Sequence, residues 1–159
     1  MIDNEILHND ADQIAEFLLT TPGIHKDTLG QFLGKKDDYN IDILNSFASK
    51  IDYRNLTIDE AMRLFLSRFR LPGEAQQIER IIEAFSNQYY QDHLASFKDS
   101  DSCYFLAFSL IFLNTMLHNS NVAENRKMTR SQFIKTNLEK DAQMETLNLG
   151  SIYDSIKAN

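Results

Sequence analysis

The sequence predicts an all-α fold, a single domain of about eight to ten helices around a central apolar helix. Apolar residues recur at helical spacing in one segment after another, and no run alternates as a half-buried strand does. Five glycines and two prolines among 159 residues are few, which favours long helices over a turn-rich β fold. Hydrophobic residues make up 43% of the chain, enough to build one globular domain with a substantial core.

Start and stop signals place the helices along the chain. A capping box at Thr57–Glu60 is expected to start one helix, and a second box at Thr129–Gln132 another. Gly34 is expected to close a short helix, and Pro72 to end a longer one at Leu71. The predicted helices lie at about residues 10 or 12 to 20, 29–33, 38–51, 58–71, 74 to a point within 87–97, 100–117, 129–138 and 147 or 149 to 156, with caps at Asp10 or Asp12 for the first and within Ser100-Asp101-Ser102 for the sixth.

The longest apolar run is Tyr104–Leu117, interrupted by Ser109, Asn114 and Thr115. It falls short of the roughly 20 residues that span a bilayer. We therefore expect the central core helix here and no direct membrane insertion.

Composition excludes several classes of function. The net charge of −7 argues against a nucleic-acid partner, which requires a basic face. The single cysteine, Cys103, cannot form an internal disulfide and is expected to be a buried apolar residue in a reducing compartment. Met1–Glu5 has neither the basic nor the apolar part of a signal peptide. No glycine-rich phosphate loop and no histidine or cysteine spacing typical of zinc is present, so no metal site is expected.

The Pro-Gly pair at Pro72 and Gly73 separates two apolar helical runs and is followed at once by Glu74. Proline fixes φ and lacks an N–H, and glycine allows backbone conformations closed to other residues. The pair is therefore expected to turn the chain and place Glu74 outward at the start of the next helix, where a carboxylate is favoured. An ordinary corner between two helices, with an unremarkable glutamate, explains the same pattern.

Two segments together resemble the signature motifs of one family. They are Phe69-Arg70-Leu71-Pro72-Gly73-Glu74-Ala75-Gln76-Gln77-Ile78-Glu79-Arg80 and Leu106-Ala107-Phe108-Ser109-Leu110-Ile111-Phe112-Leu113-Asn114-Thr115-Met116-Leu117-His118-Asn119-Ser120-Asn121-Val122. Both are similar to motifs of the Sec-seven domain, the catalytic module of guanine-nucleotide exchange factors for Arf-family GTPases. The resemblance spans essentially the whole chain. It implies an all-helical domain over residues 1–159, here without the first helix or so of the family.

The resemblance implies exchange activity on an Arf-family small GTPase. Glu74 matches the family's catalytic "glutamic finger", which enters the nucleotide site of the GTPase, repels the β-phosphate and displaces Mg²⁺. The domain itself is then expected to need no cofactor, because Mg²⁺ and GDP or GTP are bound by the partner.

The second motif implies a GTPase-binding surface. Tyr104, Phe108, Ile111 and Phe112 fall at i, i+4, i+7 and i+8, on one face of a helix. By resemblance they line a surface hydrophobic groove that binds the switch regions. The alternative is that all four side chains belong to the hydrophobic core.

The same resemblance implies two further contacts with the GTPase and shows where this sequence differs from the usual residues of the family. Asn119 matches an asparagine that contacts the switch backbone, although it could equally be a plain helix cap, and Gln76 is a weaker candidate for partner contact. Phe112, Met116 and Ser120 stand where the family usually has methionine, an aspartate or serine, and proline. These changes are expected to alter the shape of the groove and leave the response to brefeldin A open.

We expect a monomer in the cytoplasm, recruited peripherally to Golgi, endosomal or plasma membranes through flanking regions and acting in vesicle trafficking. A composition typical of an AT-rich genome also suits a bacterial effector secreted into a host cytosol. Two other classes of function stay open. One is a catalytically weak helical adaptor that binds a GTPase or other partner. The other is an enzyme using Glu74 as an acid or base, although no second catalytic residue lies beside Glu74 in the sequence.

Overall fold

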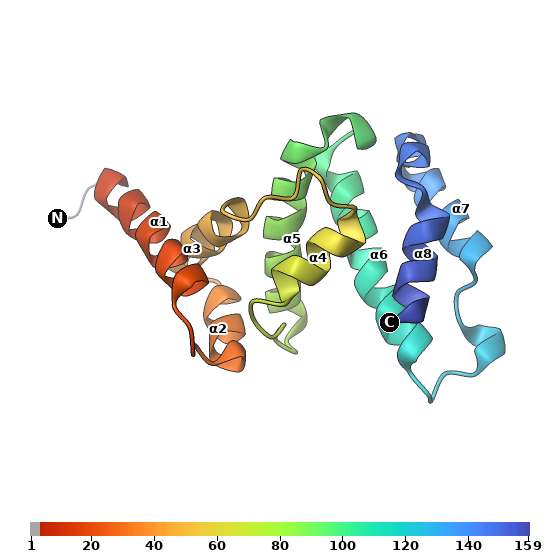
Figure 1. Ribbon diagram of the computed structural model, residues 1–159, viewed down its shortest axis with the longest axis horizontal. Helices are drawn as coiled ribbons and strands as arrows, with labels where there is room; N and C mark the ends of the chain where they lie inside the picture. The colour runs from red at the N-terminus through yellow and green to blue at the C-terminus, as the bar shows by residue number, and fades with distance from the viewer. Residues whose placement is uncertain (1–3) are drawn as a thin grey trace. The chain divides into compact units, whose positions relative to one another are not determined.

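The computed structural model describes the backbone of residues 4–159 and the side chains from Asp10 onward. Within that range the chain is helical and forms no strand, so the all-α class is confirmed (Figure 1). The elements are α1 (Asn4–Thr20), α2 (Lys26–Leu33), α3 (Asp38–Ser49), α4 (Ile58–Leu66), α5 (Ala75–Asp92), η1 (Leu94–Ser96), α6 (Ser100–His118), η2 (Glu124–Arg126), α7 (Arg130–Lys140), η3 (Ala142–Leu147) and α8 (Leu149–Ala158), where η denotes a short 3₁₀ helix.

The residues group into two compact units, of which the first comprises Met1–Asp52 and Met62–Gln88. Its core is an aromatic cluster of four phenylalanines from α3, α4, the following loop and α5. Phe65 lies at the centre, with ring centroids 5.1 to 6.2 Å from the other three, Phe47, Phe69 and Phe85. The pairs of Phe65 with Phe47 and Phe69 are edge-to-face, an arrangement that adds stability beyond the apolar area that they bury.

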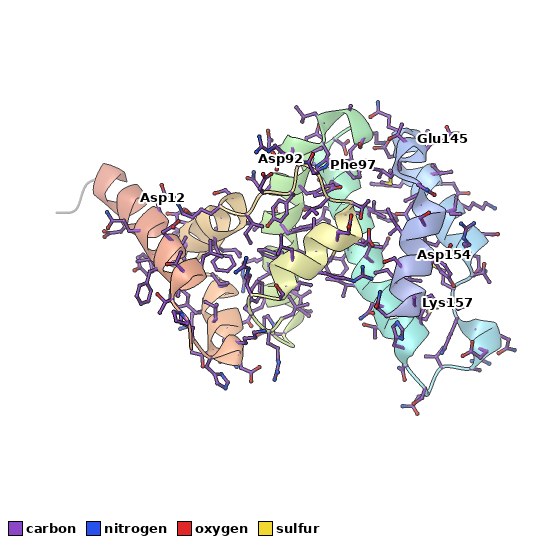
Figure 2. The ribbon with its side chains drawn as sticks, viewed as in Figure 1. Asp12, Asp92, Phe97, Glu145, Asp154 and Lys157 are labelled. Carbon is purple, nitrogen blue, oxygen red and sulfur yellow. The ribbon has the colours of Figure 1, made fainter. Side chains whose placement is uncertain are left out.

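The second unit comprises Tyr53–Ala61 and Tyr89–Asn159. Helix α8 lies beside α7 and also contacts α6 (Figure 1). Phe97, labelled in Figure 2, is buried with its ring centroid 6.3 Å from that of Tyr89. Arg130 of α7 donates to the carboxylate of Asp154 on α8 at 3.1 Å. The second predicted capping box is confirmed at the start of α7.

The predicted start of the first helix and the predicted end of the fourth are wrong. Helix α1 begins at Asn4, so Asp10 and Asp12 lie inside it, where Asp12 accepts a hydrogen bond from the Ser46 hydroxyl of α3 instead of capping. Helix α4 ends at Leu66 rather than Leu71. The chain leaves the helix there because Phe69 enters the aromatic cluster, a tertiary contact that overrides local propensity.

Helix α5 ends at Asp92, within the segment from Asn87 to Phe97 where the weakening periodicity predicts the helix end. The buried Tyr89 anchors its last turns by donating from its hydroxyl to the Leu56 carbonyl at 3.0 Å. The N-cap of α6 is Asp99, one residue before the predicted group. Its carboxylate accepts from the Ser102 backbone N–H at 2.9 Å, and this hydrogen bond lowers the pKa of Asp99.

Gly34 ends α2 as predicted, but not in a left-handed conformation, since its φ is −83°. A glycine is favoured at this position for a different reason, which is the space available beside α5. A Cβ at Gly34 would lie 3.1 Å from Cβ of Gln77 in α5, tighter than ordinary packing. Close approach between two helices therefore explains this glycine.

Candidate functional site

Glu74 lies exposed immediately before α5. Its carbonyl accepts from the backbone N–H groups of Gln77 and Ile78 at 3.1 and 3.0 Å, so Glu74 closes the first turn of the helix. Its carboxylate makes no hydrogen bond or ion pair with any residue in the described part of the chain. The side chain is thus available to a partner, as the Pro-Gly turn predicts.

The loop that carries Glu74 belongs to the first unit and is held in place on the N-terminal side of Glu74. Phe69 is 2% exposed, and its ring lies edge-on to Phe47 with centroids 5.9 Å apart. The next residue, Arg70, donates from its backbone N–H to the Lys26 carbonyl at 3.1 Å. Two consecutive residues are therefore held, one by burial and one by a backbone hydrogen bond.

Helix α6 has a buried face and an exposed apolar face. The buried residues are Ser102, Cys103, Leu106, Ala107, Leu110 and Leu113. On the other side, Tyr104, Phe108 and Ile111 are half-buried and Phe112 is 53% exposed. The rings of Tyr104 and Phe108 lie 5.5 Å apart. The alternative in which all four are core residues does not hold, because none of them is buried.

Asn119 and Gln76 lie at helix ends. Asn119 follows α6 directly and is its C-cap residue, as the local alternative predicts. Its side-chain Oδ1 accepts from the Asn121 backbone N–H at 2.9 Å and closes a turn after the helix. The side-chain amide NH₂ of Asn119 has no acceptor among the described residues and is free to donate to a partner. Gln76 is exposed in the first turn of α5. Glu74 and Gln76 belong to the first unit, and the α6 residues and Asn119 to the second.

Sequence reasoning missed the residues that fix the loop after α6. Lys127 donates from Nζ to the Leu117 carbonyl at 2.9 Å. The backbone N–H of Met128 donates to Sδ of Met116 at 3.1 Å, and the Tyr153 hydroxyl donates to the Met128 carbonyl at 2.6 Å. These contacts join residues 10 to 25 positions apart, so no local pattern signals them. They restrain the segment that begins with Asn119.

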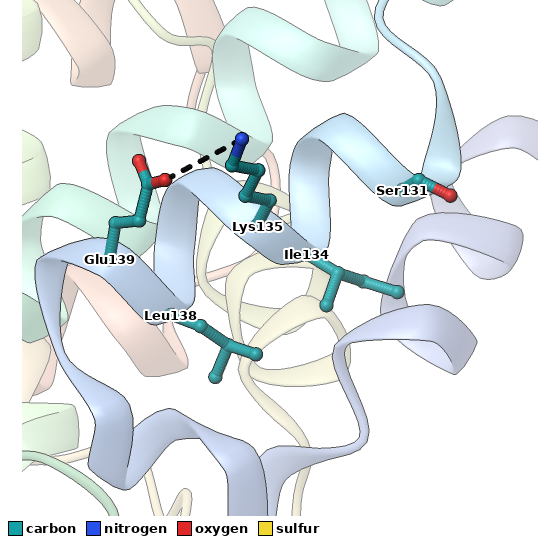
Figure 3. Close-up of a pocket in the computed structure, with 5 residues that line it drawn as sticks. All are labelled: Ser131, Ile134, Lys135, Leu138 and Glu139. Atoms are coloured by element: carbon teal, nitrogen blue, oxygen red, sulfur yellow. Dashed lines mark ion pairs between the residues drawn. The ribbon is translucent and has the colours of Figure 1, made fainter.

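A separate surface hollow of about 490 Å³ lies along α7. Ser131, Ile134 and Leu138 line it together with Lys135 and Glu139, whose charged groups approach to 3.9 Å (Figure 3). None of the predicted site residues lines it, so it is not part of the candidate site. Among the residues that the structure describes, no group of three or more histidine, cysteine, aspartate or glutamate side chains is placed to hold a metal ion.

Helix α6 is longer than the apolar run in the sequence. With 19 residues and a mean hydropathy of 1.3 it is long and apolar enough to cross a membrane, the one such helix in the described range. The prediction that this helix is too short to cross a bilayer is therefore wrong. Its buried residues share one face, the arrangement of a helix that packs within a domain, so the absence of membrane insertion stays a prediction.

Cys103 is fully buried, and burial raises the pKa of its thiol. We expect a thiol reagent to modify the native protein at least about a hundredfold more slowly than the protein in concentrated guanidinium chloride, because modification needs local opening. Raising the pH from about 7 to about 9 speeds modification of an ordinary thiol, whose pKa is about 8.5, but should leave native Cys103 slow. Rapid stoichiometric labelling at pH 7 would show a reactive thiol instead.

Comparison with known proteins finds one matching family and several similar structures. The family described as "Sec7 domain" matches residues 1–159. Rat cytohesin-3 is 38% identical over 159 residues, covering 99% of this chain and 39% of its own length. A solved structure of ARF1-GDP bound to a Sec7 domain complexed with brefeldin A has a TM-score of 0.78 at 38% identity, covering 94% of this chain and 75% of that one. A chimeric protein with the Sec7 domain of Rickettsia prowazekii RalF has a TM-score of 0.81 at 34% identity, covering 97% of this chain and 43% of that one.

The chain therefore belongs to the Sec7 domain family, the family that its two motifs resemble. It spans 39% of the length of rat cytohesin-3, so the resemblance concerns a part of that relative.

Proposed function

We propose that this domain is a guanine-nucleotide exchange factor that promotes GDP release from an Arf-family small GTPase. The observation that carries the proposal is the exposed Glu74 carboxylate, without an intramolecular partner among the described residues, on a loop anchored at Phe69 and Arg70. Family membership supports it, as does the likeness to the Sec7 domain solved with ARF1-GDP.

The proposed mechanism is electrostatic. A carboxylate inserted beside the β-phosphate brings two negative charges together in a site from which water is largely excluded. At a separation of about 4 Å and an effective dielectric constant of about 20, two unit charges repel by about 4 kcal/mol, or roughly a thousandfold in affinity. Mg²⁺ in such sites is held by few protein ligands together with the phosphates, so displacing it weakens the nucleotide further.

Binding linkage then accounts for catalysis without covalent chemistry. A protein that binds the nucleotide-free GTPase more tightly than the GDP complex must lower the affinity for GDP by the same factor. In the proposal, the apolar face of α6 supplies that binding through Tyr104, Phe108, Ile111 and Phe112. Asn119 donates to the switch backbone from its free amide group, and Gln76 contacts the partner beside Glu74.

The direct test is release of fluorescent GDP from an N-terminally truncated, Mg²⁺-loaded Arf protein. We expect the domain to accelerate release in proportion to its concentration, until the GTPase is saturated. Binding to nucleotide-free Arf with no acceleration would instead favour the weak adaptor. The proposal gives the domain no cofactor of its own, because Mg²⁺ and nucleotide belong to the GTPase.

The proposed setting is the cytosol, with a monomeric domain recruited to Golgi, endosomal or plasma membranes by regions outside residues 1–159, in vesicle trafficking. If the source is bacterial, as for the Rickettsia prowazekii relative, the corresponding setting is a host cytosol reached by secretion. The exchange reaction is the same in both settings.

A further inference from the structure

Helix α2 contacts the chain on the N-terminal side of Glu74, at Arg70. The Arg70 backbone N–H donates to the Lys26 carbonyl at 3.1 Å, and its guanidinium lies 3.1 Å from the Asp27 carboxylate. One turn further along α2, a Cβ at Gly30 would lie 1.8 Å from the Arg70 carbonyl oxygen, an impossible distance. The loop backbone therefore rests directly on Gly30, where only a residue without a side chain fits.

The same helix contacts the chain on the C-terminal side of Glu74. The carbonyl of Gly34, the residue that ends α2, accepts from Nε and Nη2 of Arg80 at 3.0 and 2.8 Å. Gly34 also faces Gln77, whose backbone N–H donates to the Glu74 carbonyl. The first turns of α5 are thus fixed to the end of α2.

Between these two contacts lie only a few residues, and one of them is Pro72, whose ring fixes φ. Such a segment has little freedom once both of its ends are held.

We propose that α2 is the element that positions the Glu74 carboxylate, with Gly30 as its main positioning residue. This inference rests on the proposed function. Its physical reason is that a catalytic group displaced by about 1 Å can lose a hundredfold in rate. Asp27 contributes less to positioning the loop, because an exposed ion pair such as the one between Asp27 and Arg70 adds little stability.

The test is Gly30→Ala, with Gln31→Ala as the matched control on the same helix. Alanine is the better helix former, so helix propensity favours the variant and cannot explain a loss. We expect GDP release at saturating domain to fall at least about tenfold. The domain concentration that gives half-maximal release should change less than about twofold, because α6 supplies the docking surface. Gln31 is exposed, and Gln31→Ala should leave both quantities unchanged.

Hydrogen exchange of the Arg70 amide separates displacement of the loop from general damage. In Gly30→Ala this amide should lose protection while the amides of α3 and α6 keep theirs, and the melting temperature should fall, because the backbone of Arg70 has to move. A displaced loop with an unchanged rate at saturation would overturn the inference while leaving the exchange activity established. Retained protection and an unchanged rate would overturn it as well.

If Gly30→Ala does not fold, Arg80→Met provides a second route, because it removes both hydrogen bonds to Gly34 and leaves Gly30 in place. A reduced rate at saturation with an unchanged half-maximal concentration supports the inference, and an unchanged rate opposes it. A wild-type domain that fails to accelerate GDP release would contradict the proposed function itself, a result distinguishable from every outcome above.

Discussion

Glu74→Lys should reduce GDP release from Arf at least about a hundredfold, to near the spontaneous rate, while the domain stays folded. The substitution replaces a repulsion of about 4 kcal/mol by an attraction of similar size to the phosphate. Glu74 is exposed and without a side-chain partner among the described residues, so only a weak interaction with the N-terminus of α5 is lost, about 0.3–1 kcal/mol. Nucleotide-release kinetics and thermal unfolding of the same preparations measure both effects.

Glu83→Lys provides the matched control. Glu83 is exposed on the same helix, α5, and the substitution makes the same change in charge. It should leave release unchanged, whereas Glu74→Gln should lose part of the activity, because it removes the charge and keeps the shape. Glu74→Lys should also hold the GTPase with GDP still bound. A large fall in the melting temperature of Glu74→Lys would show that Glu74 is structural and would contradict the assignment.

Local chemistry made several helix boundaries predictable. The capping box at Thr129 and Gln132 needs only residues three apart, and it is present as the sequence indicates. The end of α4 was not predictable in this way, because Phe69 leaves the helix to meet Phe47 and Phe65. Residues far apart in sequence decide such a boundary.

The same distinction applies to the candidate site. The position of Glu74 outside its helix follows from the Pro-Gly turn, and the one-sided burial of α6 follows from its spacing. The contact of Tyr153 with Met128 depends on where α8 packs, and that of Lys127 with Leu117 depends on how the loop after α6 folds back. The sequence pattern contains neither. Gly30 is the clearest case, because the spacing Gly30-x-x-x-Gly34 indicates close packing but does not identify the Arg70 carbonyl that lies against Gly30.

Phe112→Ala should weaken binding to nucleotide-free Arf by about ten- to thirtyfold, the cost of truncating a central aromatic side chain in an interface. Its effect on the free energy of unfolding should stay below about 1 kcal/mol. Phe112 is 53% exposed, so its truncation removes little buried apolar area. Titration of the domain in the release assay measures the first quantity, and urea unfolding the second.

Phe17→Ala controls for the loss of an exposed phenylalanine as such. Phe17 is 59% exposed on α1, so its truncation removes the same side chain from a similarly open position. It should leave binding to Arf unchanged. A stability loss of about 3–5 kcal/mol in Phe112→Ala is the cost expected of a buried aromatic residue and would contradict the binding role. Equal binding losses in both variants would also contradict it, because a docking surface on α6 requires the two phenylalanines to differ.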